Sequence, residues 1–138
     1  MRYITSLDEA FEVITSDEQS RACVITDPRL PDNPIVYVTP EFERQTGYEK
    51  AEVLGRNPRF LYGLKTDREA MAAIEDAFAS MTALEIEILN YCKDGTSFWN
   101  EMSIRPVFAE KGALKSFVTV QSTRPVADVP EMSKAAVA

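Results

Sequence analysis

The chain has 138 residues, of which 45% are hydrophobic and 27% are charged, a balance typical of one soluble globular domain. Its net charge of −7 opposes binding to nucleic acid, and the lack of histidine excludes Ser-His-Asp and Cys-His catalysis and makes a metal site unexpected. No stretch holds the roughly 18 consecutive apolar residues of a membrane span, and we expect no secretory signal. We therefore expect a cytoplasmic protein that is not an enzyme, with no catalytic residues, no metal site and no membrane contact.

The N-terminal segment, residues 1–20, is predicted to form an amphipathic cap helix over residues 6–17. Ser6 and Glu9 have the spacing of a capping box, in which each side chain bonds a free backbone amide of the first turn. Apolar residues recur at helical spacing on one face, at Leu7, Ala10, Phe11 and Ile14. This face could pack on the protein's own sheet or on a second copy in a homodimer, and the pattern leaves both open.

Short β-branched segments and turn residues divide the next part of the chain. Ala22–Thr26 and Ile35–Val38 are predicted strands, joined by a connection that contains three prolines. Short helices are expected to follow, beginning at Thr39, at Glu49 and at a capping box formed by Thr66 and Glu69.

Three longer strands are predicted in the second half, over residues 83–91, 98–107 and 114–123. The first two are joined by a hairpin turn with Asp94-Gly95 at its centre. Residues 124–138 contain two prolines and many small residues, and we expect them to form a loosely ordered tail. Strands at both ends with helices between them predict an α+β fold.

Three carboxamide side chains fall on the apolar faces of the last three strands. Asn90 and Asn100 lie on either side of the hairpin turn and are predicted to sit roughly opposite each other, and Gln121 lies on the final strand. A buried unpaired amide costs about 1–3 kcal/mol, so each needs a partner. They could bond one another or water, or they could bind the edge of a planar heterocycle, because each amide carries both a donor and an acceptor.

The segment Gly55-Arg-Asn-Pro-Arg-Phe-Leu-Tyr-Gly63 resembles the flavin-contacting helix of LOV domains, the blue-light subclass of the PAS family. The motif of that family reads Gly-Arg-Asn-Cys-Arg-Phe-Leu-Gln. The resemblance extends over about residues 22–121. It implies a PAS/LOV fold with five antiparallel strands and short helices over one face, and a core at 21–123.

The resemblance also implies a cofactor and its contacts. The expected flavin is FMN, with riboflavin or FAD as alternatives; the second reading is a LOV relative that has lost its cofactor. The amides Asn90, Asn100 and Gln121 are expected at the edge of the ring. The flavin tail is expected on Asn57, Arg59 and Tyr62, and the ring on Val24, Thr26, Met102 and Ile104.

Four positions depart from the family pattern. Pro58 stands where the family has its reactive cysteine, so the cysteinyl adduct formed after blue light is not expected here. Glu75 stands at the position of a second phosphate-binding arginine, which favours riboflavin over FMN. Tyr62 and Thr119 are bulkier than the family's glutamine and glycine.

We therefore predict a LOV-like sensory domain that binds a flavin non-covalently. Light would act by photoreduction of the flavin, with an electron from Tyr62, Tyr91 or Trp99, and Gln121 would pass the change to the last strand. The signal would go to a separate partner, from a homodimer joined through the N-terminal helix. The alternative is a cofactor-free PAS interaction module.

Overall fold

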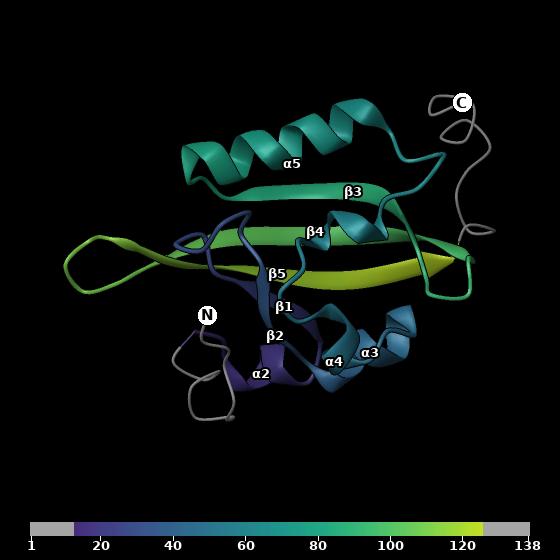
Figure 1. The fold of residues 1–138 in the computed structure, drawn as a ribbon, viewed down its shortest axis with the longest axis horizontal. Coiled ribbons are helices and arrows are strands. Elements are labelled where there is room, and N and C mark those ends of the chain that lie inside the picture. Colours follow the sequence, from purple (N-terminus) through teal and green to yellow (C-terminus); the bar gives the residue numbers. More distant parts are fainter. Residues whose placement is uncertain (1–12, 126–138) are drawn as a thin grey trace.

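The computed structural model describes residues 13–125, in which five strands form one antiparallel sheet of order β2-β1-β5-β4-β3 (Figure 1). The strands are β1 Ala22–Thr26, β2 Ile35–Val38, β3 Leu84–Tyr91, β4 Ser97–Phe108 and β5 Leu114–Pro125. The last strand in sequence lies at the centre of the sheet because it pairs with both β1 and β4. The predicted α+β fold with five antiparallel strands is confirmed.

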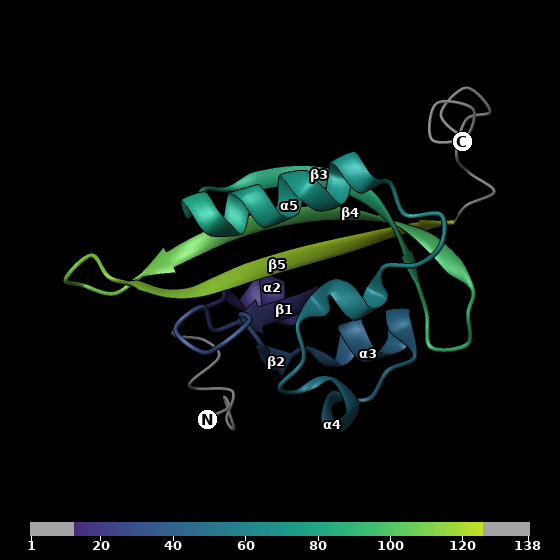
Figure 2. The ribbon, with the colours of Figure 1, turned by 45° about the horizontal axis from the view of Figure 1, so that its top comes forward.

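Short helices cover one face of the sheet, which we call the inner face. They are α3 Pro40–Thr46, α4 Lys50–Val53, the 3-10 helix η1 Pro58–Leu61 and α5 Arg68–Ser80. In both views α5 runs beside β3 and β4, whereas α3 and α4 lie near β1 and β2 (Figure 2). Two groups of apolar side chains result, one under α5 around Ile74 and Ile88, the other under α3 and α4 around Phe42 and Val53.

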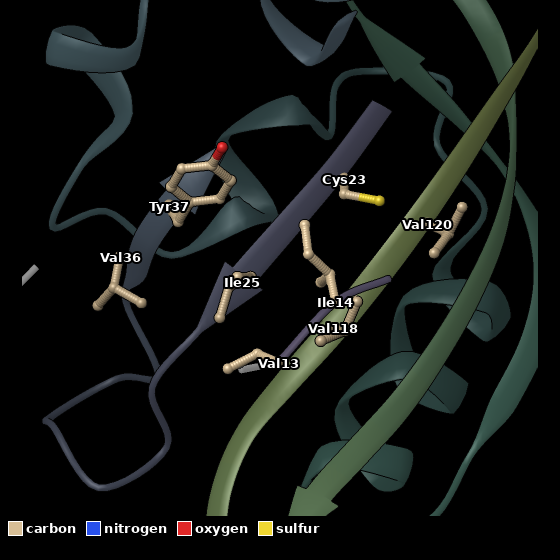
Figure 3. Packing of buried hydrophobic residues seen from close by; sticks show 8 residues of the cluster. All are labelled: Val13, Ile14, Cys23, Ile25, Val36, Tyr37, Val118 and Val120. Carbon is tan, nitrogen blue, oxygen red and sulfur yellow. The ribbon is translucent and has the colours of Figure 1, made fainter. Parts of the chain in front are cut away.

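The opposite face of the sheet is covered near β1 by the start of the described chain. Val13 and Ile14 are buried there with residues of β1, β2 and β5. Figure 3 shows their side chains gathered with Ile25 and Val118. Cys23 belongs to the same cluster, and burial raises the pKa of its thiol to about 12.

The predicted N-terminal helix over residues 6–17 falls mostly outside the described residues. Within them, Val13 and Ile14 are not helical, and a separate short helix, α2 Ser16–Gln19, begins after Thr15. Thr15 and Glu18 form the capping box of α2, bonding each other's backbone amides at 3.1 and 2.9 Å. Ile14 is therefore not on a helix, although its spacing in the sequence predicted one. Its side chain packs on the sheet from the turn that precedes α2.

Arg105 on β4 fastens this N-terminal segment to the sheet. Its guanidinium donates to both carboxylate oxygens of Glu18 and to the carbonyl oxygen of Val13, at 3.0 Å. These hydrogen bonds are the main cause of a lowered pKa for Glu18. A carboxylate with a lowered folded-state pKa adds stability above its unfolded pKa, about 4.3, and this contribution is lost as the pH falls through the folded value.

Replacement of Glu18 by glutamine is therefore expected to lower the free energy of unfolding by about 1–2 kcal/mol at pH 7. The difference from wild type should shrink below about pH 4, where the wild-type carboxylate becomes protonated. Urea unfolding at pH 7 and pH 3 measures both. Glu41→Gln is the matched control, because Glu41 pairs with Arg44 at the surface and should cost less than about 1 kcal/mol. Equal losses in the two variants would contradict this role of Glu18.

Two further predictions need correction. Asp67, not Thr66, is the N-cap of α5, and it accepts a hydrogen bond from the amide of Glu69. The buried Thr66 hydroxyl instead accepts from the amide of Gly63 at 2.9 Å and donates to the carbonyl of Leu89 at 2.8 Å, so it ties the loop before α5 to β3. β5 also runs to Pro125, two residues into the segment expected to be tail.

Candidate functional site

The η1 turn is positioned by its own capping and by a close packing contact. Asn57 is its N-cap and accepts from the amide of Arg59 at 2.9 Å, and Pro58 takes the first position, where a missing amide is tolerated. After the turn, a Cβ on Gly63 would lie 2.2 Å from the ring of Tyr91. Only glycine therefore lets the chain pass this ring, whose hydroxyl accepts from the amide of Lys65 at 3.1 Å.

The register of the sheet arranges the predicted site residues in adjacent rows on the inner face. Gln121 on β5 lies beside Met102 on β4. In the next row Thr119 lies between Val24 on β1 and Ile104 on β4. The sheet thus brings together residues almost 100 positions apart in sequence.

Asn90 and Asn100, predicted to sit roughly opposite each other, are diagonal neighbours that lie two residues off direct register. Ile88 faces Asn100 across the two strands, and Asn90 faces Phe98. The amides are nevertheless in contact, because Nδ2 of Asn100 donates to Oδ1 of Asn90 at 2.8 Å. Residues on the same face two positions off register remain within reach of side chains of this length.

The three amides do not satisfy one another completely. Nδ2 of Asn90 donates to the carbonyl of Leu89 at 3.2 Å. Among the described residues, Oδ1 of Asn100 and Nε2 of Gln121 are buried without a hydrogen-bond partner. One free acceptor and one free donor are left on this part of the sheet, and each costs about 1–3 kcal/mol if it stays unpaired. The amide cluster is therefore suited to a polar ligand.

A cavity lies between the inner face, η1 and α5, with a volume of about 30 Å³. Eight of the ten predicted site residues line it: Val24, Asn57, Arg59, Tyr62, Asn90, Met102, Ile104 and Gln121. Pro58, Leu61, Ile74, Glu75, Phe78 and Thr119 complete the lining. This volume holds about two water molecules, whereas sites for small organic ligands typically measure roughly 300–1,000 Å³. A ring can enter only if part of the wall moves outward.

The remaining candidates lie away from the cavity wall. Asn100 does not line the cavity but donates a hydrogen bond to Asn90, which does. Thr26 is buried in β1, and its hydroxyl has no hydrogen-bond partner among the described residues. Trp99 and Tyr91 pack with Leu89 and do not line the cavity, so Tyr62 is the one of the three suggested electron donors that does. Neither Cys23 nor Cys92 lines it.

The polarity of the cavity changes from its floor to its opening. Asn90 and Gln121 are almost completely buried at the floor. Arg59 and Glu75 are exposed, and Asn57 is half-buried; we call these three residues the mouth. Tyr62 lies between the two, and burial raises the pKa of its hydroxyl to about 12, with Glu75 adding to the shift and Arg59 opposing it.

Residues of the mouth are bonded to the loop between β1 and β2, a connection that the sequence did not reveal. Arg59 donates to both carboxylate oxygens of Asp32 at 2.6 and 2.7 Å. Nδ2 of Asn57 donates to the backbone oxygen of the same residue at 2.8 Å. Asp32 and Asn33 have φ of +67° and +48°, so this loop makes a left-handed turn over the η1 turn. Asp32 was missed because it lies 25 residues before Asn57.

Comparison with known proteins identifies the family. A family model described as "PAS domain" matches residues 20–122. The chain is 49% identical over 98 residues to a blue-light-activated histidine kinase of Brucella ovis. Its fold superposes on the light-state structure of the Aureochrome1 LOV domain with a TM-score of 0.75 and 36% identity, covering 91% of this chain and 94% of that one.

This chain is a LOV domain of the PAS family. The LOV domain of the Erythrobacter litoralis EL346 blue-light activated histidine kinase is also similar, with a TM-score of 0.73, 35% identity and coverage of 76% and 96%.

The LOV domain corresponds to only one part of its larger relatives. The matched region covers 71% of this chain and 20% of the Brucella ovis kinase, so the chain spans about a fifth of the curated relative's length. This LOV domain belongs to a family of blue-light photosensory domains. In the described part of the LOV domain no helix is long and apolar enough to cross a membrane.

Proposed function

We propose that this LOV domain binds a flavin non-covalently in the cavity and senses blue light without a covalent bond to a cysteine. The observation that carries the proposal is the buried Nε2 of Gln121, which belongs to a residue lining the cavity and has no hydrogen-bond partner among the described residues. The amides of Gln121 and Asn90 carry donor and acceptor atoms next to apolar walls, which suits the edge of a flavin ring. Pro58 lines the cavity where a thiol would be needed, and it has none.

A flavin, when bound, supplies absorption of blue light and one-electron redox chemistry. The residues of the chain would hold and orient it. Asn90 and Gln121 would bond the ring edge, with Asn100 fixing the amide of Asn90, and Met102 and Ile104 would pack on the ring. Asn57 would bond the tail at the mouth. The domain would act as a sensor and not as an enzyme, in the cytoplasm, with FMN or riboflavin as cofactor.

The route of the signal follows from the position of β5. Gln121 pairs with Ala22 on β1 and with Met102 on β4, so a change in its bonding acts at the centre of the sheet. Residues 1–12 and 126–138 lie outside the described part of the chain. We propose that the N-terminal segment joins two copies in a homodimer and that a separate partner receives the signal.

A second candidate function is that of a cofactor-free PAS interaction module. The small volume of the cavity favours it, because about 30 Å³ cannot hold a flavin unless side chains move. Met102, Tyr62 and Phe78 are large half-buried side chains of the wall, and movement of such side chains would enlarge the cavity. Flavin binding separates the two candidates directly.

Replacement of Asn90 by leucine is expected to weaken flavin binding at least about tenfold, because the ring edge would lose a partner and remain buried. Titration of apo-protein with riboflavin, followed by quenching of flavin fluorescence, measures the affinity. Thr123→Val is the matched control, since Thr123 is an exposed residue of β5 that does not line the cavity. Unchanged affinity in a folded Asn90→Leu variant would overturn the assignment of the amides to the ring edge.

A further inference from the structure

The mouth of the cavity together with Asp32, the partner of Arg59, carries more negative than positive charge. Among the residues that line the cavity, Arg59 is the one cation and Glu75 the one carboxylate. Arg59 is already engaged by a third group, because both of its terminal nitrogens donate to Asp32 at 2.6 and 2.7 Å. One cation therefore stands against two carboxylates where the cavity opens.

The negative charge of Glu75 affects the pKa values of Arg59 and Tyr62, two other residues that line the cavity. The pKa of Arg59 is raised, chiefly by its hydrogen bonds to Asp32, and the charge of Glu75 adds to the rise. The same charge contributes to the raised pKa of Tyr62. Glu75 also lines the cavity together with Arg59 and Tyr62, and its side chain is exposed, so its charge lies where the cavity opens.

A flavin whose ring edge bonds Asn90 and Gln121 at the floor must direct its tail toward the mouth. The tail of riboflavin is an uncharged chain that carries hydroxyl groups. These hydroxyl groups can form hydrogen bonds with the amide of Asn57 and can donate to carboxylate oxygens. The tail of FMN ends in a phosphate that carries about −1.5 to −2 charges at neutral pH. At the mouth this phosphate would meet Glu75 and would compete with Asp32 for Arg59.

We propose that the cavity selects a flavin with an uncharged tail, of the riboflavin class, over phosphorylated flavins, because Asp32 neutralises Arg59 and Glu75 repels a phosphate at the mouth. This inference rests on the proposed binding of a flavin and names the chemical class of the ligand. Asp32 takes the place on Arg59 that the phosphate would otherwise occupy. Both carboxylates are exposed to solvent, so the selectivity depends on ionic strength.

The test compares the affinities of the apo-protein for riboflavin and for FMN, measured separately by fluorescence quenching at low salt. We expect riboflavin to bind at least about tenfold more tightly than FMN, and added salt to narrow the gap through screening. In Glu75→Gln the ratio of the FMN Kd to the riboflavin Kd should fall severalfold. Asp76→Asn is the control, because Asp76 is the next residue of α5 and does not line the cavity; it should leave the ratio unchanged.

Each outcome has a distinct meaning. Tighter binding of FMN than of riboflavin, or a ratio that Glu75→Gln does not alter, would overturn the proposed selectivity and leave flavin binding intact. Binding of neither flavin by folded protein would overturn the proposed function itself, and the selectivity with it.

Discussion

Replacing Pro58 by cysteine is expected to give a flavin-loaded protein that loses its blue absorption under illumination and regains it in the dark. Pro58 lines the cavity at the first position of η1, between Asn57 and Arg59. A thiol at this position corresponds to the reactive cysteine of the LOV motif. Cysteine can adopt the backbone conformation of a 3-10 helix, so the turn should keep its shape.

Absorption spectra recorded in air before, during and after blue illumination test this expectation. Wild type and Pro58→Ala should behave alike, since neither has a thiol in the cavity wall. If wild type showed the same loss and slow recovery as Pro58→Cys, another group would have to react with the flavin. Cys23 and Cys92, the two free cysteines of the described chain, would then be the residues to replace next.

Replacing Gln121 by leucine is expected to leave a flavin-loaded protein yellow and to abolish its light-dependent structural change. The carboxamide of Gln121 can both donate and accept, so it can respond when the protonation of a bound ring changes, whereas leucine cannot. The position matters because β5 is bonded to β1 on one side and β4 on the other. A rearrangement here therefore reaches both neighbouring strands.

Hydrogen exchange of the backbone amides of β1 and β5, measured in darkness and under blue light, reports this change. Ser122→Ala is the control, because Ser122 is the next residue on the strand and bonds Arg21 at 3.2 Å on the other face of the sheet. It should retain the difference between dark and light. A light-dependent difference that survives in Gln121→Leu would contradict transmission through this amide.

The sequence predicted the strands well because their signals are local. β-branched runs, an Asp-Gly turn and alternating charge gave all five strands to within about two residues at most boundaries. The helix starts were less reliable, since Thr66 has the spacing of a capping residue but bonds β3 and Gly63 instead. Competition between a local cap and a long-range partner cannot be read from spacing alone.

The site was predictable in its residue types and less so in its geometry. The sequence places Asn90 and Asn100 on the apolar faces of neighbouring strands, but the register pairs Asn90 with Phe98 and leaves Asn100 two residues away on the diagonal. Asp32 was not anticipated as a partner of Arg59, because the turn that brings it there depends on left-handed residues in a long loop. The volume of the cavity also depends on side-chain packing, which no pattern in the sequence gives.

In the proposed function, the amides on β3, β4 and β5 and the η1 turn enclose a site for a flavin. Incubating purified apo-protein with riboflavin and passing it through a gel-filtration column tests this most directly. We predict that blue absorbance elutes with the protein at about one flavin per chain and that its fluorescence is altered by the buried site. Flavin that elutes entirely free from a folded protein would contradict the claim.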